Sequence, residues 1–446
     1  MKKPRIPPKS KELIELFENK DVINYMTNKE ITGFINEMNR RYLSWDELIH
    51  RPTPNNANKE LIWMLMKFNR NSTKKKLPIC DEKGFSFEFN ITDSIQQKLH
   101  EFDMNLGGNI GSTQIIPPEE KNRYLISSIM EEAIASSQLE GASTTRKIAK
   151  DMLKSARKPK NKSEKMILNN YLTAKMIKNS QTKKLTPEFI LEIHKSVTND
   201  TLEDKNFEGK FRDSDDIKVV DEMTGEIFHH PQNANLIPKL VEVVCNFVNN
   251  ERPYFIHPLI KASILHFLIG YIHPFVDGNG RTARSLFYWY LSKEGYWIIE
   301  FMSISRVIIK SPVKYACAYI HTETDDNDLT YFINYQLRTM KLALNELKSY
   351  ILRKIQEKNE LFKIIEGIEH INERQAYILK KFYDDPRKTL TIREVQEIFS
   401  VVYQTARQDL LQLEEKDFLK RKIIGKKQIM FLRSNNFIEL IDKKIN

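Results

Sequence analysis

The sequence of 446 residues predicts a mainly α-helical protein with only a few short strands. Apolar residues recur at helical spacing in several segments, among them residues 126–139 and 283–291. A charged segment from about Thr330 to Glu366 has the length of one long helix. Strand-like patterns are confined to short runs such as Phe85 to Phe89, where apolar and polar residues alternate. These observations favour helical cores with small β-hairpins attached.

We expect four regions: an N-terminal region at 1–115, a central domain at 116–340, a helical connector at 341–370 and a C-terminal domain at 371–446. The length agrees with about three domains of ordinary size. The apolar fraction of 41% is enough for their cores.

The sequence of the N-terminal region predicts two amphipathic helices, at 42–49 and 63–70, with Pro52 and Pro54 between them. A strand at 85–89 should follow, and then a helix capped by Thr92 or Asp93. The pattern indicates a packing and positioning region.

Charge and cysteine content limit the class of protein. A net charge of +11 favours an acidic partner without naming it. The three cysteines, Cys80, Cys245 and Cys317, lie far apart and are odd in number, which fits a reducing compartment. Because no segment approaches the ~20 apolar residues of a membrane span, we expect a cytoplasmic protein without membrane contact.

The most informative segment reads His-Pro-Phe-Val-Asp-Gly-Asn-Gly-Arg-Thr-Ala-Arg from His273 to Arg284. Apolar residues at helical spacing follow it, so the loop 277–280 should open a helix. The start of a helix presents unpaired N–H groups to an anion. The segment therefore predicts a site for phosphate chemistry.

The loop residues have distinct predicted roles if the anion is a nucleotide. Gly278 and Gly280 let the backbone approach phosphate oxygens, because they lack a Cβ and permit positive φ. We expect Asn279 to donate its side-chain amide to a phosphate oxygen. Asp277 offers the single carboxylate that a Mg²⁺ shared with phosphates needs.

The flanking residues complete the site. Arg281 and Arg284 can clamp the distal phosphates with bidentate donors. His273 is suited to take a proton from an attacking hydroxyl at neutral pH. The alternative is a structural glycine-rich helix start with a buried histidine.

The segment resembles, at every defining position, the signature of the Fic family, His-Pro-Phe-x-Asp-Gly-Asn-Gly-Arg-x-x-Arg. The resemblance implies a Fic-type helical core, preceded by an N-terminal extension like those of many bacterial members. It also implies transfer of AMP from Mg-ATP to a hydroxyl of a target protein, with His273 as the base and Thr282 among the nucleotide-binding residues. Phosphorylating relatives carry Lys where this chain has Gly280.

A second element, Ser136-Ser-Gln-Leu-Glu-Gly141, ends a predicted helix at about 126–141. It resembles the Fic inhibitory motif, in which Glu140 would pair with Arg284 and block the productive pose of the ATP γ-phosphate. The alternative is a helix end where Gly141 terminates the helix and Glu140 is a solvated charge.

Two short β-prone runs surround a glycine-containing turn at 221–225 and predict a hairpin. The resemblance makes this hairpin the flap over the site, where an extended target segment adds as a strand. An ordinary surface hairpin is the alternative. The flap residues are Val219, Val220, Ile227 and Phe228.

The segments around the signature add an adenine pocket. We expect a buried helix at 259–272 that leads to His273, and we expect His257 and His266 to be core or supporting residues rather than metal ligands. Tyr315 matches a family position that lines the adenine pocket. Many relatives carry Asn where this chain has Glu323, which alters the contacts to the base.

The C-terminal domain resembles a winged helix-turn-helix. We expect helices at 374–383, 391–399 and 403–415, then strands at 419–424 and 428–432. Candidate DNA-binding residues are Gln404, Arg407, Lys420, Arg421, Lys422, Lys426 and Lys427. Against DNA stand the acidic residues Asp409, Glu414 and Glu415, and such modules also serve as protein-interaction or homodimerisation units.

Two classes of function remain open at this point. One is an autoinhibited adenylyltransferase that modifies a target protein or itself. The other is a DNA-binding regulator that self-modification switches. A Glu-bearing Fic site can also remove AMP, with Glu140 activating water.

Overall fold

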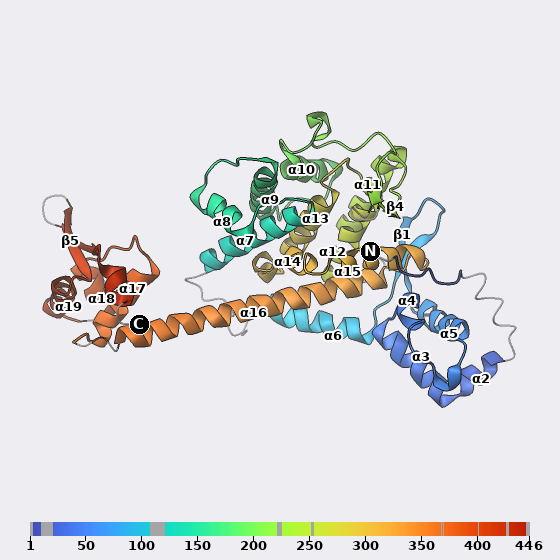
Figure 1. The fold of residues 1–446 in the computed structure, drawn as a ribbon, viewed down its shortest axis with the longest axis horizontal. Coiled ribbons are helices and arrows are strands. Elements are labelled where there is room, and N and C mark those ends of the chain that lie inside the picture. Colours follow the sequence, from blue (N-terminus) through green and yellow to red (C-terminus); the bar gives the residue numbers. More distant parts are fainter. Residues whose placement is uncertain are drawn as a thin grey trace. The chain divides into compact units, whose positions relative to one another are not determined.

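A computed structural model describes residues 3–9, 21–107, 121–220, 225–250, 254–366, 368, 370–399, 401–424 and 428–442 (Figure 1). The chain divides into two compact units, Met1–Leu347 and Lys348–Asn446. The fold is mainly α-helical, as predicted. Within the described ranges, no helix combines the length and apolar character that a membrane crossing requires.

In the N-terminal part of the first unit, the predicted helix at 63–70 and strand at 85–89 are confirmed. The helix predicted at 42–49 is limited to Trp45–Leu48, and two helices that were not predicted precede it. This part also holds a strand that the sequence did not predict, β1, which pairs antiparallel with β2. Thr92 caps α6 by accepting from the Ile95 N–H. The elements are α2 (Asp21–Thr27), α3 (Lys29–Arg41), α4 (Trp45–Leu48), α5 (Lys59–Asn71), β1 (Lys75–Cys80), β2 (Ser86–Phe89) and α6 (Asp93–Phe102).

The rest of the first unit is a helical core with one hairpin. Its helices are α7 (Lys121–Leu139), α8 (Arg146–Ser155), α9 (Lys162–Lys178), α10 (Pro187–Thr198), α11 (Ile237–Asn249), α12 (Pro258–Ile272), α13 (Asn279–Lys293), α14 (Ile304–Ile308) and α15 (Pro312–Thr324). The hairpin consists of β3 (Val219–Val220) and β4 (Ile227–His229).

Helix α12 lies at the centre of this core because its side chains are apolar on all faces. Pro258 occupies its first turn, where a missing N–H costs no hydrogen bond. The helix packs against α13, and the signature loop connects the two. The buried helix predicted to deliver His273 is thus confirmed.

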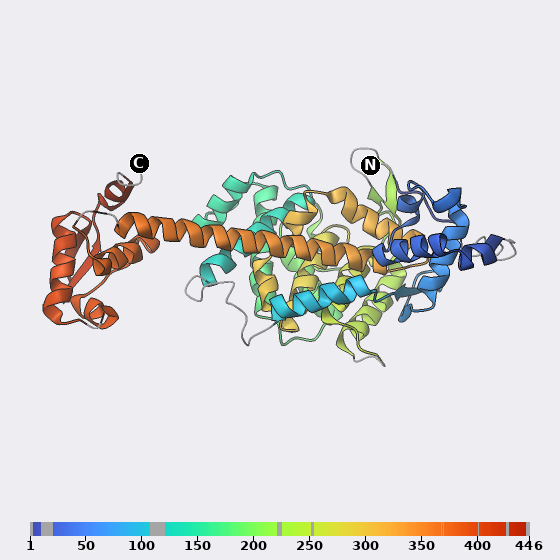
Figure 2. The same cartoon turned by 90° about the horizontal axis from the view of Figure 1, so that it is seen from below.

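Helix α16 (Thr330–Glu366) begins in the first unit and continues into the second. In the first unit α6 runs alongside it, as both views show (Figures 1 and 2). Lys98 of α6 donates to Asn334 of α16 at 3.3 Å. The predicted long helix from Thr330 to Glu366 is confirmed.

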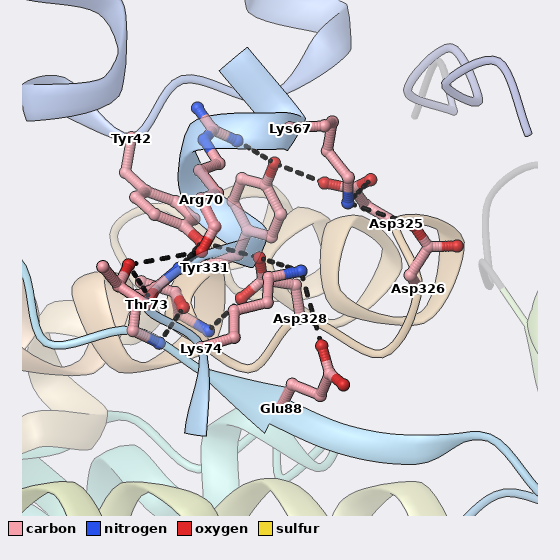
Figure 3. A network of polar contacts seen from close by, with 12 residues as sticks. Tyr42, Lys67, Arg70, Thr73, Lys74, Glu88, Asp325, Asp326, Asp328 and Tyr331 are labelled. Carbon is pink, nitrogen blue, oxygen red and sulfur yellow. Dashed lines mark hydrogen bonds and ion pairs between the residues drawn. The ribbon is translucent and has the colours of Figure 1, made fainter. Parts of the chain in front are cut away.

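A buried polar network joins the N-terminal part to the start of α16 (Figure 3). Lys67 Nζ lies 2.7 Å from Asp325 Oδ1, and Lys74 Nζ lies 3.1 Å from Asp328 Oδ2. Tyr42 donates to Asp328 at 2.6 Å. Both regions predicted before residue 340 lie in the first compact unit, and the boundary predicted between them at residue 115 lies outside the described residues.

The second unit has the predicted order of elements. It contains α17 (Glu373–Asp384), α18 (Ile392–Phe399), α19 (Tyr403–Glu415), β5 (Leu419–Ile424), β6 (Gln428–Arg433) and a further helix, α20 (Phe437–Asp442). Strands β5 and β6 pair antiparallel, and Leu390 adds a bridge to Phe431. The unit has its own apolar core. The winged helix-turn-helix assignment stays a prediction.

We predict that Asp328→Asn destabilises the first unit. Asp328 is fully buried, and its loss would leave the Lys74 charge, on a side chain only 2% exposed, without this partner. Removing one member of a buried pair costs about 3 kcal/mol. Urea denaturation measures the loss, and Glu37→Gln, which breaks a surface pair with Arg40, is the control and should change little.

The same variant has a defined pH signature. Burial alone would raise the pKa of Asp328, but Lys74, Lys67, Thr330 and Tyr42 together lower it to about 2. A lowered carboxyl pKa stabilises the fold above its ordinary value near ~3.9, and that stabilisation is lost as the pH falls through the folded pKa. The difference between the native chain and Asp328→Asn should therefore shrink from about pH 4 towards pH 2. A constant difference would contradict this account.

Candidate active site

The signature loop is a tight turn between two buried helices. His273 ends α12 in the left-handed region (φ 51°), and Gly278 precedes α13 with φ 85°. A Cβ at Gly278 would lie 2.7 Å from Thr198 Cγ2, so this position requires glycine both for its φ and for space.

The side chain of Asn279 stabilises this turn through hydrogen bonds to its main chain. Its Oδ1 accepts from the Phe275 N–H at 2.9 Å, and its Nδ2 donates to the Phe275 carbonyl at 2.8 Å. The side chain is buried. Both ends of the amide thus bind the main chain, but Nδ2 carries a second N–H, so the predicted bond to a phosphate oxygen stays a prediction.

His273 is held in one orientation. Its Nδ1 lies 3.2 Å from the Gly270 carbonyl, which can only accept, so Nδ1 carries the proton and Nε2 is the basic nitrogen. Burial lowers the pKa of His273 to about 4, and the Gly270 carbonyl opposes this effect. The imidazole is neutral at neutral pH and can accept a proton.

Two side chains that sequence reasoning missed hold the turn from outside. The Nδ1 of His194 accepts from the Gly209 N–H at 3.1 Å, so its Nε2 donates to the Asp277 carbonyl at 2.9 Å. The ring stacks on Phe275 at 3.7 Å. Arg212 donates to the His273 carbonyl at 2.9 Å. No local pattern marks either residue, because their partners lie 61 to 83 residues away.

Asp277 and Arg281 form a pair at the start of α13. Asp277 Oδ1 accepts from Arg281 Nη2 at 3.2 Å, and its Oδ2 accepts from no described residue. The side chain is 46% exposed, which suits a carboxylate that binds a Mg²⁺ arriving with phosphates. Within the described part of the chain, no cluster of three or more His, Cys, Asp or Glu side chains could hold a metal ion.

Arg281 is bound by the protein at two of its nitrogens, and its predicted role as a clamp of the distal phosphates stays a prediction. Its guanidinium is buried, and Nη1 donates to the Val197 carbonyl at 2.9 Å. Since a second nitrogen is bound to Asp277, two of its donor groups are engaged by the protein. The residue is placed to orient Asp277 and to close the last turn of α10.

Arg284 is brought together with the predicted inhibitory residues. Its Nε donates to Ser136 Oγ at 2.9 Å, and its Nη2 donates to the Ser136 carbonyl at 3.1 Å and to Glu140 Oε1 at 2.8 Å. The arginine side chain is 2% exposed and Glu140 is 25% exposed. A Cβ at Gly280 would lie 2.3 Å from Glu140 Oε1. Glu140 therefore lies directly against the glycine loop.

The end of α7 combines features of both alternatives considered for this motif. Gly141 follows the helix end with φ 87°, as a terminating glycine does. Glu140, however, is not a solvated charge, because it is bound to Arg284. The helix end thus serves to present the carboxylate.

Tyr315 and Thr282 complete the predicted nucleotide residues. The Tyr315 hydroxyl lies 2.9 Å from His266 Nε2. Thr282 is fully buried, and its hydroxyl has no hydrogen-bond partner within the described ranges. His266 is a core residue and His257 caps α12, in agreement with the prediction for these histidines.

The predicted flap is a hairpin, but its turn at 221–224 lies outside the described residues. Val219 pairs with His229 and Val220 pairs with Ile227, so Phe228 is the extra residue of a β-bulge. A role in target binding stays a prediction.

The candidate DNA-binding residues are exposed where the structure describes them. Gln404 and Arg407 lie on α19, and Lys420, Arg421 and Lys422 lie on β5. Lys426 and Lys427 lie outside the described residues.

Comparisons with known proteins identify a Fic domain in this chain. Residues 184–291 match the model of the Fic/DOC family. The chain is 31% identical over 128 residues to a protein adenylyltransferase Fic of Nematostella vectensis, covering 28% of this chain and 27% of that protein. It is 33% identical over 134 residues to that of Drosophila grimshawi, covering 29% and 25%. The chain thus aligns with about a quarter of the length of these relatives.

A solved structure shows the same fold. The chain is similar to a Fic family protein from Desulfovibrio desulfuricans with a TM-score of 0.51 and 16% identity, over 78% of this chain and 97% of that chain.

We predict that His273 and His194 take up protons only near pH 4, as nitrogen-detected NMR of the imidazoles would report. Burial is the main cause for both lowered pKa values. Because the folded pKa lies below the ordinary ~6.5, both residues stabilise the fold above that pH, and this stabilisation is lost as the pH falls through about 4. A His273 midpoint near 6.5 would mean that water reaches the ring freely.

Proposed function

We propose that this chain, which contains a Fic domain, is an autoinhibited protein adenylyltransferase that transfers AMP from Mg-ATP to a Ser, Thr or Tyr hydroxyl of a target protein or of itself. The observation that carries the proposal is the Arg284 guanidinium, which ends the signature and is bound by Ser136 of α7 and by Glu140, directly after that helix.

The proposed reaction uses the residues as the loop arranges them. His273 Nε2 takes the proton of the acceptor hydroxyl, the oxygen attacks the α-phosphorus, and pyrophosphate leaves with the electrons of the broken P–O bond. The N–H groups at the start of α13 face the phosphates. Asp277 holds the Mg²⁺ of the substrate, which neutralises phosphate charge, and Arg281 orients Asp277.

Inhibition follows from competition for Arg284. The donors that a distal phosphate needs are occupied by Ser136 and Glu140. ATP can bind productively only when the end of α7 gives up these bonds, so the active state is a minor one until a signal favours it.

The glycine at position 280 fits the proposed adenylylation, since phosphorylating relatives carry Lys there. A Cβ at Gly280 would lie 2.3 Å from Glu140 Oε1, so a larger residue would make the Glu140 side chain shift.

We predict that Glu140→Gly raises the incorporation of label from α-labelled ATP into protein by at least about tenfold. The reason is that less than about one tenth of the native chain would be in the active state, whereas the variant would be fully active. Adding His273→Ala should abolish incorporation while Mg-ATP binding persists. Glu131→Gln is the matched control, since this second α7 glutamate pairs with Arg146 and Lys150 instead.

The outcomes separate the alternatives. Label from the γ position would show phosphorylation despite Gly280. No label from either position would favour AMP removal by the same site or a mainly DNA-binding role.

A second candidate function is DNA binding by the second unit. Asp409 is buried against Arg374 at 2.7 Å, and Glu414 pairs with Arg421 at 3.0 Å. Of the three acidic residues that would repel DNA, Asp409 is therefore buried and Glu414 is paired with a basic side chain. The exposed polar and basic side chains of α19 and β5 suit groove and phosphate contacts.

For this candidate we predict that the full-length chain binds duplex DNA with a salt dependence whose log–log slope falls by about one in Lys422→Ala. Fluorescence anisotropy measures the slope. Lys29→Ala, an exposed residue of α3, removes the same charge from the first unit and should leave the slope unchanged. Absence of binding at low salt would leave protein interaction or homodimerisation as the role of this unit.

A further inference from the structure

The flap strand β4 is attached to the core through its last residue, His229. Its Nδ1 lies 2.7 Å from Glu323 Oε2 of α15, and its Nε2 lies 2.7 Å from the Tyr271 carbonyl of α12. The side chains of His229 and Glu323 are 10% and 20% exposed. One imidazole therefore connects the flap to two helices of the core.

The two hydrogen bonds fix the orientation of the His229 ring. A carbonyl oxygen only accepts, so Nε2 donates to the Tyr271 carbonyl. The other ring nitrogen, Nδ1, then faces the Glu323 carboxyl group at 2.7 Å. Because the two partners lie on different helices, the ring cannot turn without losing both contacts.

The bulge in β4 explains how His229 reaches inward. Phe228 is the extra residue opposite Val219 and Val220, and a bulge re-aims the side chain that follows it. His229 keeps its pairing with Val219 while its ring points between α12 and α15.

The anchor lies beside the catalytic base. Tyr271 is two residues before His273, in the last turn of α12. The His229 ring donates to the Tyr271 carbonyl, so it lies against the turn that leads into His273. Because β4 is attached here, its distance to His273 Nε2, which takes the proton of the acceptor hydroxyl, is fixed.

We propose that His229 and Glu323 are positioning residues that anchor the flap, so that an acceptor hydroxyl carried along β4 is presented to His273. This role rests on the proposed function in one respect, namely that the flap binds the acceptor chain. Glu323, at the position where many Fic relatives carry Asn, serves the flap rather than the adenine base.

Hydrogen exchange with mass spectrometry on the full-length chain tests the anchor without requiring activity. The amides of β4 should exchange about tenfold faster in His229→Gln and in Glu323→Gln. The double variant should be no faster than the faster single variant, because both remove the same contact. Glu192→Gln, which breaks an exposed pair with Lys183, is the control. Unchanged exchange in both single variants would overturn the anchor.

Self-labelling from α-labelled ATP in the Glu140→Gly background tests the positioning role. Glu323→Gln should lower the maximal labelling rate about tenfold while KM for ATP stays within about twofold, since the nucleotide site is unaltered. A rise in KM for ATP with an unchanged maximal rate would assign Glu323 to the nucleotide instead and refute positioning. If the parent chain shows no labelling, the proposed function fails, and the exchange experiment still decides whether the anchor exists.

Discussion

The buried charge of Arg284 is the constraint on which this site depends. Removing a guanidinium from water costs several kcal/mol unless acceptors replace the lost hydration. In this structure Ser136 of α7 and Glu140, directly after the helix, provide those acceptors. If α7 moves away, an anion must take their place, and a nucleotide phosphate is such an anion. Under the proposed function, inhibition by Glu140 and binding of a nucleotide phosphate are two ways to satisfy the same buried charge.

A second constraint is the backbone of the signature loop. His273 and Gly278 both have positive φ, and such a turn persists only when its surroundings hold it. Asn279, His194 and Arg212 supply that support by binding main-chain groups of the loop. Because these supports are buried, the base and Asp277 keep their relative positions before substrate arrives. Such preorganisation lowers the cost of reaching the reactive geometry.

Helix α15 links features that are far apart in the sequence. Tyr315 lies in its first half, and Glu323 near its end holds the flap strand. Asp325, directly after the helix, forms an ion pair with Lys67 of the N-terminal part (Figure 3). The N-terminal part, Tyr315 and strand β4 are thus all attached to this helix or to the residue that follows it. If α15 moved, these three parts would move with it, because packed helices move as units rather than deform.

The sequence by itself determined the features that local spacing encodes. The signature loop opens α13, the apolar segment before it is α12, and the C-terminal order of helices and strands matches its predicted pattern. Tertiary structure alone decided the partners of the polar side chains. Asn279 hydrogen-bonds to the main chain of Phe275, and Arg281 donates to the Val197 carbonyl. His229 contacts Glu323, which lies 94 residues later in the sequence. Periodicity reports which face of an element is buried, whereas a hydrogen-bond partner depends on which distant donor or acceptor reaches the same point in space.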